Sequence, residues 1–265
     1  MNNEHSYWKQ QTTDKPLYPD IEWSKPEQKA MRGRLGIIGG NKLGFTGVAE
    51  NYEVALKSGI GEIRVLMPEA LRKSIPITMT DVLFGSSNPS GSLSRDALND
   101  MKATGEWSTG ILLIGDAGRN SETAILYEDF IRSYTGPLII TRDAIDLIKN
   151  SSAMIVNRPN TTLVLSFAQL QKLFSAVYYP KVLTFSMQMT NLVEALHKFT
   201  ISYPINILTF HNDTILVASN GDISSMPFDT PTDIWRGKIA TIASIYWLWN
   251  LSKPFESITA SLIKN

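Results

Sequence analysis

Glycines are concentrated between residues 36 and 47, directly after the start of the apolar run 35–38. A glycine-rich turn between a strand and a helix can hold a phosphate group with its backbone N–H groups. No three of these glycines form Gly-x-Gly-x-x-Gly, and no lysine follows Gly44 as a Walker A loop requires. The turn is therefore either a ligand-binding loop of another type or a tight turn without a ligand.

Residues 230–237 are a second candidate, because they carry Asp233 ahead of the strongly apolar stretch 239–249. That stretch predicts a buried helix, whose amino end favours an anion or an acidic side chain. Taken by itself, Asp233 is consistent with an ordinary N-cap acid of a helix. Pro231 has no N–H, so the expected backbone donors belong to the three residues that follow it.

Side chains that bind metals are scarce and scattered. The three histidines, His5, His197 and His211, fall in a polar leading segment, on an expected helix and after an expected strand. Their spacing fits no metal-ligand pattern. The chain has no cysteine, which excludes disulfides and thiolate sites. We therefore expect no metal site built from protein side chains.

The hydrophobic pattern predicts an α/β fold that brings these segments together. Short apolar runs typical of strands buried on both faces lie at 35–38, 63–67, 82–84, 111–114, 138–140, 162–164 and 205–208. Helical patterns lie between them, at 48–58, 93–101, 121–131 and 190–199, and the first closes on Gly59. Open α/β sheets bind ligands at the carboxyl ends of their strands, so the loops that follow the runs are the expected site.

Composition limits the classes of function. The chain has 265 residues and is 43% hydrophobic, enough for one large domain, which we expect over 31–265. Its 25 basic and 25 acidic residues cancel, which argues against binding to nucleic acid or a membrane. No signal peptide or long apolar span is apparent, so a cytoplasmic protein is expected. Residues 1–30 are predicted to form an extended polar arm that packs on the body through Trp8, Tyr18 and Trp23.

The order of these motifs resembles that of the ADP/ATP-dependent NAD(P)H-hydrate dehydratases, the YjeF carboxy-terminal family with a ribokinase-like fold. The resemblance runs from about residue 32 to residue 237. It rests on Gly-Arg-Leu-Gly-Ile-Ile-Gly-Gly-Asn-Lys-Leu-Gly-Phe-Thr-Gly at 33–47 and on Ser-Gly-Ile-Gly at 58–61. Residues 230–237 align with the family's Gly-Thr-Gly-Asp-Val-Leu-Ala-Gly and keep Asp233 and Gly237. The resemblance implies three layers, with a mainly parallel sheet between helices.

The resemblance also implies a set of site residues. Asp233 would be the catalytic base, and ADP or ATP with Mg²⁺ would phosphorylate the hydrate hydroxyl before phosphate leaves. The nucleotide and its phosphates would contact Thr214 and the loop residues Thr232, Asp233 and Ile234. The NAD(P)H-hydrate would contact Gly40, Asn41, Thr46, Gly47, Gly115, Gly118 and Ser166. A homo-oligomer, a tetramer in this family, is also implied.

Several family residues are replaced in this chain. Ser166 stands where the family has a substrate-contacting histidine, Gln169 where it has glutamate, and Phe210 where it has lysine. Asp143 keeps one of two family aspartates, or is an acid of a helical first turn. The sequence thus indicates either a divergent NAD(P)H-hydrate dehydratase or an impaired relative with a nucleotide-binding, structural or regulatory role. A small-alcohol kinase of the same fold is a third hypothesis.

Overall fold

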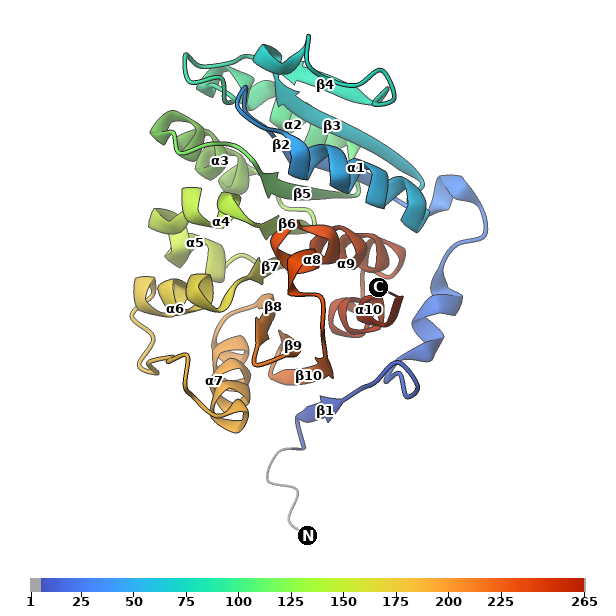
Figure 1. The fold of residues 1–265 in the computed structure, drawn as a ribbon, viewed down its shortest axis with the longest axis vertical. Coiled ribbons are helices and arrows are strands. Elements are labelled where there is room, and N and C mark those ends of the chain that lie inside the picture. The colour runs from blue at the N-terminus through green and yellow to red at the C-terminus, as the bar shows by residue number, and fades with distance from the viewer. Residues whose placement is uncertain (1–5, 265) are drawn as a thin grey trace.

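A ten-stranded sheet forms the centre of the computed structural model, which describes residues 6–264 (Figure 1). The strand order is β1-β10-β9-β8-β7-β6-β5-β2-β3-β4, and β9 alone is antiparallel to its neighbours within the described chain. The strands are β1 (Trp8–Gln10), β2 (Arg34–Gly39), β3 (Glu62–Pro68), β4 (Val82–Gly85), β5 (Gly110–Gly115), β6 (Leu138–Thr141), β7 (Thr161–Leu165), β8 (Ile205–His211), β9 (Thr214–Ser219) and β10 (Asp222–Pro227).

Helices cover both faces of the sheet. The α-helices are α1 (Thr46–Ser58), α2 (Leu98–Trp107), α3 (Ser121–Ser133), α4 (Asp143–Leu147), α5 (Ser152–Val156), α6 (Phe167–Ala176), α7 (Met189–Ser202), α8 (Pro231–Trp235), α9 (Lys238–Trp249) and α10 (Pro254–Ser261). Helices α2 to α7 pack on one face, and α1, α8, α9 and α10 pack on the other (Figure 1). This arrangement confirms the predicted three-layer α/β fold.

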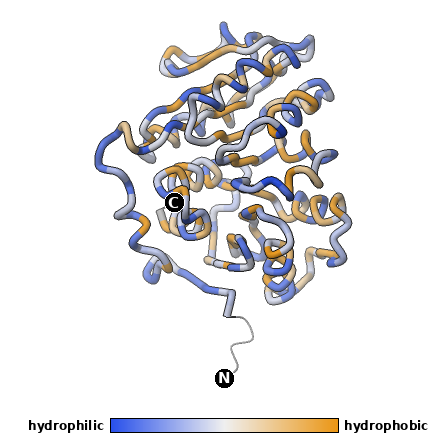
Figure 2. Tube along the Cα trace, turned by 180° about the vertical axis from the view of Figure 1, so that it is seen from behind, coloured by the Kyte–Doolittle hydropathy of each residue, from blue (hydrophilic) through white to orange (hydrophobic). Residues whose placement is uncertain are grey.

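Alternating side chains of the central strands supply both halves of the core. In β5, Ile111 and Leu113 join the cluster under α2 to α7, whereas Leu112 and Ile114 join the cluster under α1 and α9. Successive strand residues point to opposite faces, so a strand covered on both sides must be apolar throughout. Figure 2 shows hydrophobic residues along the central strands and a mostly hydrophilic N-terminal segment.

Two expected helix boundaries differ from the structure. The helix expected at 93–101 is a short 3-10 turn at Arg95–Ala97 followed by α2, because the side chains of Asn88 and Thr123 hold the Leu93 carbonyl in a loop. The C-terminal helix is interrupted at Gly237, whose φ of 83° separates α8 from α9. A side chain there would be strained, and its Cβ would lie 2.5 Å from Ile114 Cδ1.

The N-terminal segment lies against the body from its first described residues. β1 pairs in parallel with β10, and the Trp8 indole donates to Ser225 Oγ at 2.8 Å. Tyr18 packs edge-on against Phe255 of α10, but Trp23, expected to pack as well, is 87% exposed.

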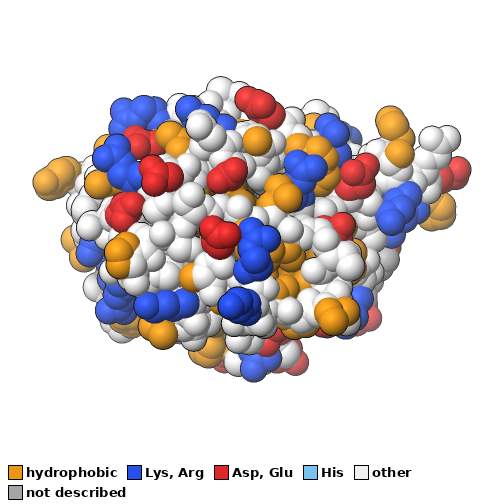
Figure 3. Space-filling view, turned by 90° about the horizontal axis from the view of Figure 1, so that it is seen from above, with side chains coloured by type: hydrophobic (Ala, Val, Ile, Leu, Met, Phe, Trp, Pro, Cys, Tyr) orange, Lys and Arg blue, Asp and Glu red, His pale blue; other side chains and the backbone are white. Residues whose placement is uncertain are grey.

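Two general properties bear on partners. Among residues 6–264, no helix is long and apolar enough to cross a membrane. Basic and acidic side chains are interspersed on the face seen in Figure 3. No patch of a single charge dominates that view, in line with the balanced composition.

Candidate functional site

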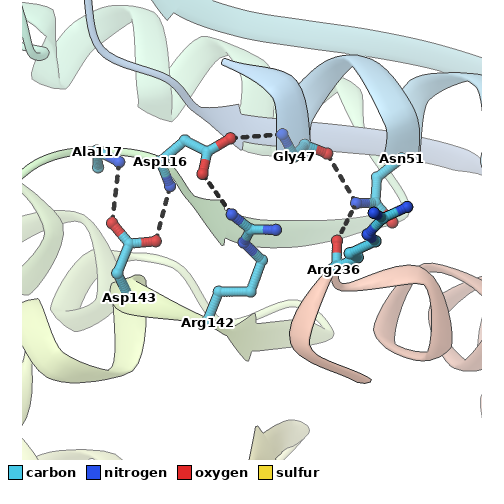
Figure 4. Close-up of polar contacts among 7 residues, drawn as sticks. All are labelled: Gly47, Asn51, Asp116, Ala117, Arg142, Asp143 and Arg236. Carbon is cyan, nitrogen blue, oxygen red and sulfur yellow. Dashed lines mark hydrogen bonds and ion pairs between the residues drawn. The ribbon is translucent and has the colours of Figure 1, made fainter. Parts of the chain in front are cut away.

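The loops after β2, β5 and β6 meet at the carboxyl edge of the sheet (Figure 4). The Gly40 N–H donates to the Gly115 carbonyl at 2.9 Å, which joins the first two loops. Asp116 follows Gly115 with φ of 53°, and Arg142 follows β6 with φ of 57° and ψ of −140°. The left-handed region is tolerated by Asp, whereas the conformation of Arg142 is rare for a non-glycine residue, costs about 1–3 kcal/mol and is of a kind that clusters at functional sites.

Asp116 and Arg142 form an ion pair across these loops. Their side chains are only 16% and 20% exposed. The second oxygen of Asp116 accepts the Gly47 N–H at 2.6 Å, in the first turn of α1. A Cβ on Gly47 would lie 2.7 Å from Arg142 Cζ, so a glycine is needed where the guanidinium crosses α1. The pair therefore fills the space beside the amino end of α1 that the sequence indicated as a ligand loop.

Asp143 clamps the β5–α3 loop from the other side. Its carboxylate accepts the N–H groups of Asp116 at 2.8 Å and Ala117 at 3.2 Å. Burial raises the pKa of the Asp143 carboxyl, while the hydrogen bond from the Asp116 N–H acts in the opposite direction. Gly115 makes room for this contact, because a Cβ there would lie 2.1 Å from Asp143 Oδ1.

Asn51 connects α1 to the break between α8 and α9. Its Nδ2 donates to the carbonyls of Gly47 and Arg236, each at 2.7 Å. Its Oδ1 accepts the Thr241 hydroxyl at 2.6 Å. The side chain thus satisfies a carbonyl that the helix break leaves without a helical partner, and it fixes α9 against the site.

Asp233 lies in α8, which ends before the long buried helix begins. Its Oδ2 accepts Lys238 Nζ at 3.1 Å, and its N–H donates to the Thr230 carbonyl at 2.9 Å. Helix α9 begins only at Lys238, so Asp233 lies five positions before the helix whose amino end was expected to hold it. The Asp233 N–H and one of its carboxylate oxygens therefore have partners within residues 230–238.

A cavity of about 420 Å³ opens beside the ion pair. Its lining includes Asp116, Arg142, Asp143, Ser166, Gln169 and Trp235. The Trp235 side chain is 58% exposed, whereas Arg142 Nε is buried with no hydrogen-bond acceptor among the described residues. The cavity therefore offers an aromatic surface and a guanidinium with unused donor capacity.

Ser166 and Gln169 line the cavity, but their side chains are engaged in hydrogen bonds within the protein. They form a capping box at the start of α6, in which Ser166 Oγ accepts the Gln169 N–H at 3.2 Å. Gln169 Nε2 donates to the Arg142 carbonyl at 2.9 Å and so fixes the strained residue. Gln169 thus supports Arg142 directly, and Ser166 holds Gln169 in place.

The remaining expected site residues have varied surroundings. Asn41 is buried and donates to Ser92 Oγ at 2.6 Å, and Gly118, with φ of 69°, lies beside it. Thr46 is exposed at the start of α1. Thr214 begins β9 and donates to the Asn212 carbonyl at 3.3 Å. The structure thus brings together most of the expected substrate residues, whereas the contacts of Thr214 and Asp233 are with their own neighbours.

Asp116, Arg142 and Trp235 were not among the expected site residues. Asp116 and Arg142 each follow a buried apolar run directly, and β5 and β6 are adjacent parallel strands. Opposite charges placed directly after neighbouring strands are a signal from which this ion pair could have been predicted.

The described residues do not provide a resident Mg²⁺ site. Nowhere along 6–264 do three or more His, Cys, Asp or Glu side chains cluster in a way that could hold a metal ion. The carboxylates of Asp116 and Asp143 are engaged by Arg142 and by backbone N–H groups. Mg²⁺ is usually held by one or two carboxylates together with waters and substrate phosphates, so an ion here would arrive with the nucleotide rather than occupy a cage of protein side chains.

Neither a family model nor a curated protein matches this sequence. Solved structures do match its fold. A ribokinase-like superfamily protein from Enterococcus faecalis has a TM-score of 0.73 at 13% identity, over 99% of this chain and 87% of that one. The fold is ribokinase-like.

Other solved structures share this fold. A hypothetical protein from Streptococcus mutans has a TM-score of 0.71 at 14% identity, over 92% of this chain and 85% of that one. An ADP/ATP-dependent NAD(P)H-hydrate dehydratase from Bacillus subtilis, co-crystallized with ATP and Mg²⁺, has a TM-score of 0.60 at 12% identity, over 93% and 86% of the two chains. At such identities these likenesses establish the fold alone.

Proposed function

We propose that this protein is a nucleotide-binding relative of the NAD(P)H-hydrate dehydratases in which phosphoryl transfer is impaired. The observation that carries the proposal is the cavity at the carboxyl edge, which combines the Arg142 guanidinium with the half-exposed Trp235 indole. A guanidinium suits phosphate oxygens, and an indole suits the face of a base. An adenine nucleotide, ADP or ATP, has both features.

The surroundings of Asp233 support the loss of phosphoryl transfer. A general base must lie within hydrogen-bond reach of the hydroxyl that it deprotonates. Lys238 Nζ binds one of the two carboxylate oxygens of Asp233, so a substrate hydroxyl would have to approach the other one beside the ammonium group. The loop has also lost one N–H donor at Pro231 and commits the Asp233 N–H to Thr230. Losing one preorganised donor of such a site costs about a hundredfold to a thousandfold in rate.

Mg²⁺ belongs to the proposal by resemblance only, as an ion carried by the phosphates of the nucleotide. A cytoplasmic location and a homo-oligomer, tetrameric by resemblance, remain parts of the proposal.

A working NAD(P)H-hydrate dehydratase is the second candidate. This candidate is favoured because four expected substrate residues lie at one edge of the sheet: Gly40, Gly47, Gly115 and Ser166. In that case Asp233 would accept the proton of the hydrate hydroxyl, ADP or ATP would supply the phosphoryl group, and loss of phosphate would restore NAD(P)H.

Ligand-induced thermal stabilisation and turnover separate the two candidates. We expect ADP or ATP to raise the melting temperature of the full chain, and we expect no repair of NADPH hydrate in the presence of ADP and Mg²⁺. Repair that is abolished by Asp233→Asn would favour the second candidate. If ADP, ATP, adenosine and NADPH all leave the melting temperature unchanged, both candidates are wrong.

A further inference from the structure

Asp116 and Arg142 are a pair in which each partner is held in an uncommon backbone conformation. Both have positive φ, and neither is glycine. The surrounding contacts impose this geometry: Asp143 holds the N–H of Asp116, and Gln169 holds the carbonyl of Arg142. Such strain persists only where neighbours over-determine it, and it concentrates at ligand sites and switch regions.

The pair leaves Arg142 incompletely satisfied. Its Nη2 contacts Asp116, but its Nε is buried without an acceptor in residues 6–264. A guanidinium presents its donors as a planar fork that matches the oxygens of phosphate in a bidentate way. A single carboxylate oxygen on Nη2 uses only part of that fork.

Asp116 has a second favourable partner. Its Oδ2 accepts the Gly47 N–H at 2.6 Å, in the first turn of the 13-residue helix α1. An acid is stabilised at a helix amino end by the unpaired N–H groups and the helix dipole. Asp116 would therefore keep a hydrogen-bonded partner if Arg142 turned away from it.

From these contacts we infer that Arg142 is the oxyanion-binding residue of the cavity, and that Asp116 occupies it until a phosphate-type ligand displaces the carboxylate. The inference rests on the proposed function, since it names the residue that would bind the phosphates of the nucleotide. The cavity beside Arg142, about 420 Å³ in volume, provides the space for the incoming group. Asp116 then lowers the affinity for a phosphate-type ligand, because its carboxylate competes with that ligand for the Arg142 guanidinium.

Inorganic pyrophosphate tests this inference without a nucleoside. Calorimetric titrations of the wild type, Arg142→Gln and Asp116→Asn with pyrophosphate, ADP and adenosine separate the contributions. Arg142→Gln should weaken pyrophosphate and ADP at least about tenfold, because a charge-assisted bidentate contact is lost. Asp116→Asn should strengthen both about tenfold, since Asn keeps an oxygen for the Gly47 N–H but no longer competes as an anion. Adenosine binding should not change in either variant.

Arg236→Gln is the matched control. The side chain of Arg236 is 67% exposed, and its Nη1 lies 3.9 Å from Glu50 Oε1. Its removal should therefore leave the dissociation constant for pyrophosphate within about twofold of the wild-type value. Equal affinity of Arg142→Gln and the wild type for pyrophosphate would overturn the inference, as would the absence of pyrophosphate binding in Asp116→Asn. If pyrophosphate binds through Arg142 but ADP and adenosine do not bind, the proposed function is wrong while the oxyanion site stands.

Discussion

Asp143 holds the β5–α3 loop by accepting two backbone N–H groups, yet burial disfavours its charge. The folded state therefore holds the Asp143 proton more tightly than the unfolded chain does. A group whose pKa is raised on folding contributes stability at low pH, and that contribution falls as pH rises through the interval between the unfolded and folded values. At neutral pH the burial of the ionised Asp143 carboxylate therefore lowers the free energy of unfolding, although its hydrogen bonds order the loop.

Replacing Asp143 with Asn tests this effect. The free energy of unfolding of the wild type relative to Asp143→Asn should fall as pH rises from roughly 4 toward 7, by at most about 1.4 kcal/mol per pH unit. The comparison of the two proteins cancels the titration of all other groups. Urea unfolding at closely spaced pH values measures the difference. A difference that stays constant or grows with pH would contradict the assigned direction of the pKa shift.

Gly47 and Gly115 were expected, through the resemblance, to contact a substrate, and that expectation stays a prediction. In the structure each occupies a place where a Cβ would collide with Arg142 or Asp143. The Asp116–Arg142 pair was not expected, although opposite charges directly after the strands β5 and β6 favour such a contact. The sequence shows these charges but not that β5 and β6 are adjacent, and the contact depends on that adjacency.

Elements with a strong local signal were the most predictable. Helix α1 ends at Gly59, whose φ of 84° fits the expected glycine stop. The β9–β10 hairpin was not expected, although Asn220-Gly221 at its turn, with φ of 47° and 84°, is a strong hairpin signal. The strand β1 could not be foreseen, because it has three residues and the Trp8 indole donates to Ser225 Oγ, 217 positions away.

The contact between α1 and the α8–α9 break depends on the two amide donors of Asn51. Asn51→Asp would place a carboxylate without donors against the carbonyls of Gly47 and Arg236. Removing the side-chain donor of the Arg236 carbonyl and placing a buried charge against two carbonyl oxygens should destabilise the protein by about 3–5 kcal/mol. Chemical denaturation gives the free energy of unfolding, and amide exchange in α9 should accelerate.

Asn157→Asp is the comparison for this element. Asn157 Nδ2 donates to a single carbonyl, that of Ala153, at an exposed position. Its replacement should change the free energy of unfolding by no more than about 0.5 kcal/mol. If the two variants were equally stable, Asn51 would not be the connection between α1 and the helix break.

At the scale of the whole molecule, the N-terminal segment closes one edge of the sheet and reaches the C-terminal helix. β1 covers β10, and an uncovered strand edge would present free N–H and C=O groups to other chains. Gln11 continues the pairing through its N–H to the Ser225 carbonyl at 2.9 Å. The Tyr246 hydroxyl donates to Glu22 at 2.9 Å and fixes the same segment to α9. The termini of the chain thus stabilise each other.

Gln11 is the residue on which this closure depends most directly. It is 1% exposed, and its Nε2 donates to the carbonyl of Thr259 in α10 at 2.8 Å. Its Oε1 accepts the Leu17 N–H at 3.3 Å. Gln11→Ala removes the bonds of a buried side chain to the Thr259 carbonyl, which keeps the Leu262 N–H as a donor, and to the Leu17 N–H, so it should cost about 1–3 kcal/mol of the free energy of unfolding. The exposed Gln10 of β1 provides the control, and Gln10→Ala should change that free energy by no more than about 0.5 kcal/mol.

Limited proteolysis should cleave the segment between β1 and α1 faster in Gln11→Ala alone. Equal cleavage of both variants would mean that the pairing of β1, rather than Gln11, holds the segment in place.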